Sequence, residues 1–160
     1  MSKMEDLMIR LELMALQDHY CSVIDNDQLE SWPKFFVEDA FYEVISRENE
    51  EGGFPAPAIR CDNAAMLRDR VLSLRNANIF ERPLYRHMIS GLTWKAEENN
   101  SYRVSSSYVI INTNASGDSI VYQAGLYQDL VVRTAEGLRF KSKRCIYDTL
   151  RVQTLLAFPI

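Results

Sequence analysis

The sequence is poor in metal-binding and cross-linking residues. Its 160 residues include only two histidines, His19 and His87, and three cysteines, Cys21, Cys61 and Cys145. Scattered cysteines in odd number do not form a disulfide framework and indicate reduced thiols, as expected of a cytoplasmic protein. The patterns C-x-x-C, H-E-x-x-H, G-x-S-x-G, Walker and G-x-G-x-x-G are also missing. The common signatures of zinc, serine-hydrolase and nucleotide sites are therefore absent.

Long apolar runs and an excess of basic charge are lacking as well. No apolar stretch approaches the ~20 residues that a membrane-spanning helix needs. The start MSKMEDLMIRLELM has acidic residues inside its apolar stretch, so we expect no signal peptide. The formal net charge is -4, whereas nucleic-acid binding normally needs a basic stripe. We therefore expect neither a membrane nor a nucleic acid as a partner.

What is present is the composition of an ordinary globular protein. The apolar fraction of 47% and the charged fraction of 25% are typical of a chain that folds. The length is enough for one domain with a sizeable buried core. We expect residues 1–160 to form a single domain.

Sequence periodicity predicts helices first and strands afterwards. Helices are expected over residues 3–25, about 28–36, and from Asp62 or Asn63 to about 77. Strands are expected at 41–45 and at about 84–96, 102–112, 119–132 and 138–148. The glycines and prolines of residues 48–57 indicate an irregular loop. This order predicts an α+β fold, an antiparallel sheet with its helices on one side.

Two of these segments have informative patterns. In the strand at 119–132, alternation puts five residues on one face: Tyr122, Ala124, Leu126, Gln128 and Leu130. The first helix is apolar on two faces. One face carries Leu7, Met8, Leu11, Met14 and Ala15, and the other carries Ile9, Leu13, Leu16 and Tyr20. A helix of this kind covers two surfaces: its own sheet, and either another part of the chain or a partner subunit.

His87 is the leading candidate for chemistry. One interpretation makes it a general base that a carboxylate such as Asp39 or Asp129 orients. The other makes it a hydrogen-bonded strand histidine that fixes a neighbouring helix. The second is the simpler interpretation, because half-buried histidines are common and no spacing specifies a partner.

Other polar and aromatic candidates also have plain structural interpretations. Asp25 and Asp39 stand at the ends of elements, where carboxylates cap helices and turns. Cations such as Arg70 and Arg144 could bind an anion or a partner's carboxylates, but a solvated or internally paired face is simpler. Trp32 is interpreted as a core residue rather than as part of a cofactor site.

Several blocks of residues occur together in the order seen in one known family. The first block comprises Tyr20, Ile24-Asp25, Trp32-Pro33, Phe35-Phe36, Asp39, Tyr42 and Val44. The second comprises Met66-Leu67, Asp69-Arg70-Val71, Leu74-Arg75 and Ala77-Asn78-Ile79. The remaining matches are Arg86-His87, Asp148-Thr149 and the tail Leu155-Leu156-Ala157-Phe158-Pro159. On these residues the sequence resembles the small (beta) subunits of aromatic-ring-hydroxylating dioxygenases.

Within that family the sequence is most similar to small subunits that work on aromatic carboxylates. Terephthalate is the first expectation, and salicylate and anthranilate follow. The runs 69–79 and Tyr85-Arg86-His87 carry this narrower resemblance. Ser90-Gly91 departs from commoner members, which place an asparagine after this serine.

The resemblance implies a fold, a partner and cofactors held elsewhere. The fold is a cystatin-like cone akin to nuclear transport factor 2, with three helices of the N-terminal half on the concave face of a curved antiparallel sheet. The partner is a large (alpha) subunit in an alpha3beta3 hexamer. That subunit would hold a Rieske [2Fe-2S] cluster and a mononuclear Fe(II), and receive electrons from a separate reductase or ferredoxin.

The residue count agrees with the absence of both iron centres from this chain. A Rieske cluster takes two cysteines and two histidines, and a facial-triad iron takes two further histidines and a carboxylate. The chain has two histidines in all. We therefore expect no cofactor in it.

The first functional hypothesis is a non-catalytic subunit. It predicts that other chains bury the outer sheet face and part of the first helix. Arginine and aromatic residues are enriched at such interfaces, and the histidine belongs to the family match. The candidate interface residues are Trp32, Arg70, Arg86, His87 and Arg144.

The alternative hypothesis is a freestanding cone-shaped enzyme of the isomerase or dehydratase kind. Its acid–base groups would be His87 with Asp39 or Tyr42. A non-enzymatic binder of small ligands on the same fold is a third hypothesis. The interior of the cone distinguishes the first two, because apolar filling favours the subunit and an open polar pocket favours the enzyme.

Overall fold

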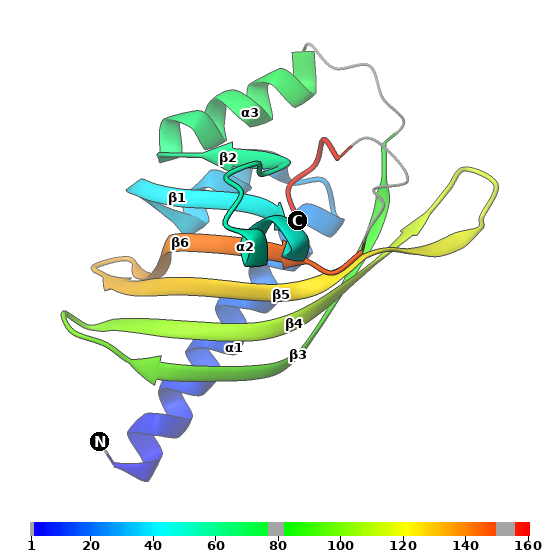
Figure 1. The fold of residues 1–160 in the computed structure, drawn as a ribbon. Helices are drawn as coiled ribbons and strands as arrows, with labels where there is room; N and C mark the ends of the chain where they lie inside the picture. Colours follow the sequence, from blue (N-terminus) through cyan, green and yellow to red (C-terminus); the bar gives the residue numbers. More distant parts are fainter. Residues whose placement is uncertain (1, 77–81, 150–155) are drawn as a thin grey trace.

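A curved six-stranded sheet with helices packed against it makes up the chain (Figure 1). The computed structural model describes residues 2–76, 82–149 and 156–160. The strand order is β2-β1-β6-β5-β4-β3. The elements are α1 (Lys3–Asp25), η1 (Leu29–Phe35), β1 (Phe36–Ser46), α2 (Arg47–Gly52), β2 (Ile59–Cys61), α3 (Ala64–Asn76), β3 (Leu84–Ala96), β4 (Ser101–Thr113), β5 (Ser119–Thr134) and β6 (Gly137–Tyr147). The predicted α+β cone is confirmed. Of the residues matched to the family, Ala77-Asn78-Ile79 and Leu155 lie outside the described residues.

The four long strands β3 to β6 form the meander that the sequence predicts, with each end within two residues of its expected place. Local turn chemistry explains this agreement. Asn99 and Asn100 adopt positive φ angles of 57° and 54°, which asparagine tolerates better than most residues. At the next turn the Asn114 side-chain oxygen accepts hydrogen bonds from the backbone of Ser116 and Asp118.

One residue of β5 leaves its predicted face. The pairing of β4 with β5 shifts register between Ile110 and Ile111, which leaves Tyr122 as an extra residue. A bulge of this kind reverses the alternation. Tyr122 is accordingly buried and stacks on Tyr85, while Gln128, farther along, is exposed.

The sheet is antiparallel except where β1 runs parallel to β6. The predicted strand 41–45 is the second half of β1. The first half was not predicted, because its pairing with β6 is irregular between Phe36 and Phe41 and its side chains do not alternate regularly. The short β2 pairs with β1 and was not predicted. Because β1 and β6 are distant in sequence, periodicity contains no information on their relative direction.

Part of the predicted loop 48–57 is the short helix α2. The Ser46 hydroxyl caps it by accepting a hydrogen bond from the Asn49 backbone, and Gly53 ends it with φ 68°. Residues 28–36 also differ from the expected α-helix. The helix η1 has 3-10 geometry, with Pro33 inside it.

The first helix confirms both predicted stripes. Leu13 and Tyr20 are buried against the sheet, whereas Leu7 and Leu11 on the other side are 48% and 50% exposed. The helix begins at Ser2, whose side chain accepts from the Glu5 backbone in a capping box. Its first half extends past the edge of the sheet (Figure 1).

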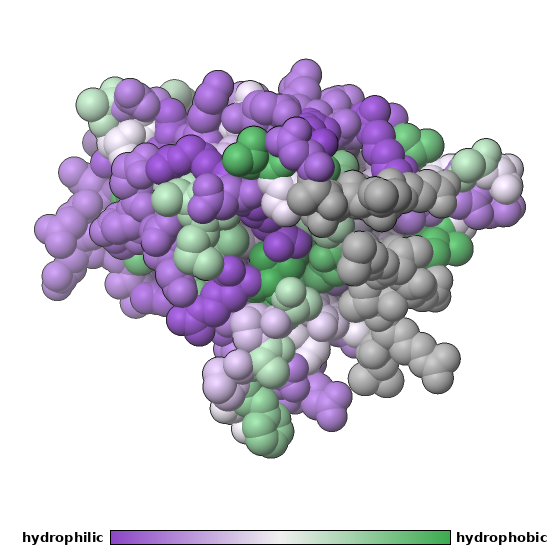
Figure 2. Space-filling view, turned by 90° about the horizontal axis from the view of Figure 1, so that it is seen from above, coloured by the Kyte–Doolittle hydropathy of each residue, from purple (hydrophilic) through white to green (hydrophobic). Residues whose placement is uncertain are grey.

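The two faces of the sheet are covered differently. Helices α1, η1 and α3 pack on the concave side, as predicted, and α2 is an additional helix on the other side. Neighbouring residues of β6 mark this division. Lys143 reaches Gln17 of α1, and Arg144 reaches Glu50 of α2. Seen from the side of α3, the surface is mostly hydrophilic (Figure 2).

Candidate functional site

The inside of the cone is filled by the last residues of the chain. In the tail, defined here as Leu156–Ile160, residues 157–160 are buried. The Ile160 backbone oxygen accepts hydrogen bonds from the Tyr20 hydroxyl at 2.6 Å, the Tyr42 hydroxyl at 3.3 Å and the Cys145 thiol at 3.4 Å. The Ile160 N–H donates to the Tyr42 hydroxyl at 2.9 Å. The strands and α1 thus bind the tail through side chains.

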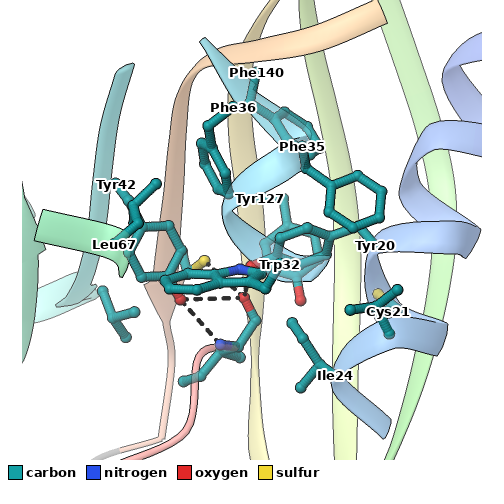
Figure 3. Packing of buried hydrophobic residues seen from close by; sticks show 14 of the residues in the cluster. Tyr20, Cys21, Ile24, Trp32, Phe35, Phe36, Tyr42, Leu67, Tyr127 and Phe140 are labelled. Atoms are coloured by element: carbon teal, nitrogen blue, oxygen red, sulfur yellow. Dashed lines mark hydrogen bonds between the residues drawn. The ribbon is translucent and has the colours of Figure 1, made fainter. Parts of the chain in front are cut away.

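Aromatic rings and one arginine enclose the tail. The labelled side chains of Tyr20, Trp32 and Tyr42 point toward one another in Figure 3, and the Trp32 and Tyr42 ring centres are 5.1 Å apart. Arg70 of α3 donates to the backbone oxygen of Ala157 at 2.7 Å. Phe158 packs edge-on against Tyr85, 6.2 Å away. The interior is therefore apolar and aromatic, with a few donors directed at the tail.

His87 is bound to the end of α1. Its ring Nδ1 lies 2.6 Å from an Asp25 oxygen, and its backbone N–H donates to the other oxygen at 2.9 Å. The His87 side chain is fully buried. One carboxylate thus holds both the ring and the backbone of His87, and ties β3 to the helix.

The groups of the proposed acid–base site have separate partners. Asp39 is exposed and pairs with Lys141, and Tyr42 is bound to Ile160. The structure therefore does not bring His87, Asp39 and Tyr42 into one site. Asp25, which the sequence suggested as a cap, takes the place of the predicted orienting carboxylate.

A buried charged cluster lies between α1 and the sheet. Lys143 donates to Asp129 at 3.1 Å and to Gln17 at 3.0 Å, and the Lys143 and Asp129 side chains have no exposed surface. The ammonium is 3.6 Å from the centre of the Tyr127 ring, a favourable cation–π position. Burial raises the pKa of Asp129, and the charge of Lys143 opposes this shift. No local pattern in the sequence indicates this cluster, because its members come from α1, β5 and β6.

The candidate interface residues fall into different environments. Trp32 is fully buried within its own chain, so its side chain is not available to a partner. Arg70 holds the tail, and His87 holds α1. On the outer sheet face Arg86 is exposed, while Arg144 binds carboxylates of the same chain.

An extended apolar feature left uncovered among the described residues is the outer stripe of α1. It begins at Met4, which is 67% exposed, and continues to Met14 at 40%. An open groove of about 540 Å³ lies beside it, between Met8, Tyr102 and Arg133. The members of the stripe are Met4, Leu7, Met8, Leu11 and Met14.

The metal-ligand residues do not fit an iron centre. The His19 ring packs on Phe35, with ring centres 5.1 Å apart, whereas the His87 ring is bound to Asp25. The two histidines therefore have separate partners. The three cysteines are free and buried. Within the described ranges, no group of three or more histidine, cysteine, aspartate or glutamate side chains could hold a metal ion. Nor does any helix described here have the length and apolar character needed to span a membrane.

Comparisons with known proteins agree with this picture. Residues 20–154 match a family described as the ring hydroxylating beta subunit. The chain is 52% identical to the small subunit of anthranilate 1,2-dioxygenase from Burkholderia cepacia, over 98% of this chain and 97% of that one. It is 29% identical to a beta subunit of terephthalate 1,2-dioxygenase from a Comamonas species, over 94% and 97%. A crystal structure of a beta subunit assigned to an aromatic-ring-hydroxylating dioxygenase of Novosphingobium aromaticivorans superposes with a TM-score of 0.89, 39% identity, and coverage of 97% and 99%.

Proposed function

The chain belongs to the ring-hydroxylating beta-subunit family, and on that premise we propose that it is a structural, non-catalytic subunit that supports a catalytic large subunit. Membership makes it the small subunit of an aromatic-ring-hydroxylating dioxygenase, and hence an oxidoreductase component with a large oxygenase subunit as partner. The separated acid–base groups and the filled cone support the non-catalytic role. An enzyme of the isomerase kind would need an open polar pocket at that position.

The single observation that carries the proposal is the outer stripe of α1. Five large apolar side chains, each at least 40% exposed, follow one face of a helix whose buried residues begin at Leu13 on the other side. A continuous exposed apolar stripe of this kind marks an interaction surface. We propose that the large subunit covers this stripe and the neighbouring outer sheet face around Arg86, within an interface above ~2,000 Å².

The finer assignments rest on similarity. We propose an aromatic carboxylate as substrate of the assembly, of the aminobenzoate class, because identity to the anthranilate enzyme's subunit is 52% against 29% for the terephthalate enzyme's subunit. The terephthalate-like substrate expected from the sequence is not confirmed. We also propose an alpha3beta3 hexamer in the cytoplasm, with the Rieske [2Fe-2S] cluster and Fe(II) in the large subunit and electrons arriving there from a separate reductase or ferredoxin.

Co-expression with the large subunit of the same system tests this proposal. We expect a mixed complex by size-exclusion chromatography with light scattering, and elemental analysis should find all iron with the large chain. A stable homodimer that ignores the large subunit would instead revive the freestanding enzyme, and mutation of His87 would then be the next step.

A pair of matched variants locates the interface. Leu11→Glu puts a charge in the middle of the stripe, and we expect it to weaken assembly at least about tenfold, as charges in a desolvated interface do. Leu72→Glu changes a leucine of α3 that is 62% exposed and lies away from the stripe, and should assemble normally. Equal behaviour of the two folded variants would place the interface elsewhere.

A further inference from the structure

Hydrogen-bond donors from four elements converge on backbone oxygens of the tail. Tyr20 of α1, Tyr42 of β1 and Cys145 of β6 meet at Ile160, and Arg70 of α3 meets Ala157. The Nε of Arg70 is buried and, among the described residues, has no hydrogen-bond partner. A guanidinium bonded to neutral peptide oxygens is less well satisfied than one bonded to a carboxylate. The tail therefore occupies a donor-rich place, in which Arg70 has, within the described ranges, only neutral peptide oxygens as acceptors.

These donors keep their protons. Burial holds the pKa of Tyr20 and of Tyr42 well above the ordinary value, although the charge of Arg70 opposes the shift at Tyr42. Burial also raises the pKa of the Cys145 thiol to about 12. Each group can thus donate a hydrogen bond at neutral pH.

Aromatic rings make up much of the rest of the interior. Tyr85 contacts Phe158 edge-on and stacks on Tyr122, with ring centres 5.2 Å apart. Trp32 contacts Tyr42 edge-on. A planar ring in place of Phe158 would keep the same edge-to-face contacts, which favour aromatic over aliphatic groups.

We propose that the interior of the cone is a binding site for a monocyclic aromatic carboxylate, and that the tail Leu156–Ile160 occupies this site as a tethered substitute for it. The carboxylate of the ligand would accept the hydrogen bonds that Ile160 and Ala157 accept now. The aromatic ring of the ligand would take the place of the Phe158 ring. Acid and tail exclude each other, so the acid binds only the fraction of molecules whose tail has left. The site requires no large subunit, so its test is independent of the proposed function.

Hydrogen exchange on the full, unmodified chain provides the first test, with benzoate as the probe. Benzoate should accelerate exchange of the backbone amides of Ala157, Phe158 and Ile160, because binding displaces the tail. Amides of the β4 and β5 pairing should be unaffected or better protected. If a high concentration of benzoate leaves the tail amides unchanged, tail and acid do not compete and the proposal is overturned.

A point variant raises the affinity without removing the tail. Phe158→Ala weakens the packing of the tail on Tyr85, and the larger fraction of open molecules should raise the apparent affinity for benzoate at least about tenfold in calorimetric titration. The matched control is Phe54→Ala, which removes a phenylalanine that is 60% exposed and lies outside the cone. Equal affinity in the two folded variants would overturn the proposal. If Phe158→Ala does not fold, the exchange experiment on the unmodified chain decides alone.

Ligand chemistry and one further substitution test the donor set. Benzamide keeps the ring and loses the charge, and cyclohexanecarboxylate keeps the charge and loses the aromatic ring, so both should bind Phe158→Ala more weakly than benzoate. Adding Arg70→Gln to Phe158→Ala should lower the ratio of benzoate to benzamide affinity about tenfold, because a guanidinium distinguishes the two ligands by charge, whereas a looser tail raises both affinities alike. Equal binding of benzoate and benzamide would overturn the assignment to carboxylates.

Discussion

Lys143 and Arg144 are neighbours on β6, yet they point to opposite faces of the sheet and into opposite environments. Lys143 is fully buried with Asp129 and Gln17, whereas Arg144 is 27% exposed and binds Glu43 and Glu50. Removing one partner of a buried ion pair leaves an uncompensated charge out of water, while a partly solvated pair is screened. The comparison indicates that the concave face, where the ionic groups are fully buried, is more sensitive to substitution than the partly solvated outer face.

The largest expected effect comes from the inner side. Lys143→Met removes the ammonium and leaves Asp129 buried without its counter-ion, so we expect a loss of about 3–5 kcal/mol in the free energy of unfolding. Urea unfolding followed by circular dichroism measures it. Combining Lys143→Met with Asp129→Asn removes both charges and should recover part of the loss. If Lys143→Met alone lowers the free energy of unfolding by less than about 1 kcal/mol, the concave face is no more sensitive to loss of an ion pair than the outer face.

A smaller effect is expected where α1 meets β3. Asp25→Ala removes the acceptor of both the backbone N–H and the ring of His87. Hydrogen bonds to charged groups contribute about 1.5–3 kcal/mol, and we expect a loss in this range. Asp18→Ala changes an exposed aspartate of the same helix and is the matched control. If the two variants unfold at the same urea concentration, the contact between Asp25 and His87 does not hold α1.

The smallest effect is expected on the outer face and depends on pH. The hydrogen bond from Arg144 lowers the pKa of Glu50 below its ordinary value of 4.5. The folded-state pKa is thus below the unfolded one, so the contribution of Glu50 is complete above pH 4.5 and is lost as pH falls through the lowered pKa. Because the pair is partly solvated, Glu50→Gln should cost less than about 1 kcal/mol at neutral pH.

The control for this experiment is Glu51→Gln, an exposed neighbour on the same short helix. The difference in urea midpoint between Glu50→Gln and the unmodified protein should shrink well below pH 4.5 and also in high salt. A difference as large as that of Lys143→Met would mean that the outer pair is as important as the inner one.

The features predicted well from the sequence are those with local causes. Asparagines and Gly137 set the turns of the meander, and side-chain alternation sets its strands. The two stripes of α1 follow from the 3.6-residue period alone. By contrast, the bulge at Tyr122 and the parallel pairing of β1 with β6 depend on partners distant in the chain, so no local sequence pattern predicts them.

The site was predicted less well for the same reason. The sequence identifies His87, but Asp25 becomes its partner only because α1 crosses the sheet at that point. Lys143 has the sequence context of a surface cation and becomes buried because Gln17 and Asp129 enclose it. The apolar run after residue 154 was the available signal for the tail, although nothing in it specifies that Tyr20 and Tyr42 receive it.

The bond from Tyr20 to Ile160 joins residues 140 positions apart, among the longest separations that the fold contains. Contacts of such separation are slow to form, because the chain must close a large loop before it gains any stabilisation. We therefore expect the tail to dock after the folding transition state. Interactions made that late govern the rate of unfolding and leave the rate of folding almost unaffected. The last residues of the chain would thus set how long a folded molecule survives, rather than how quickly it forms.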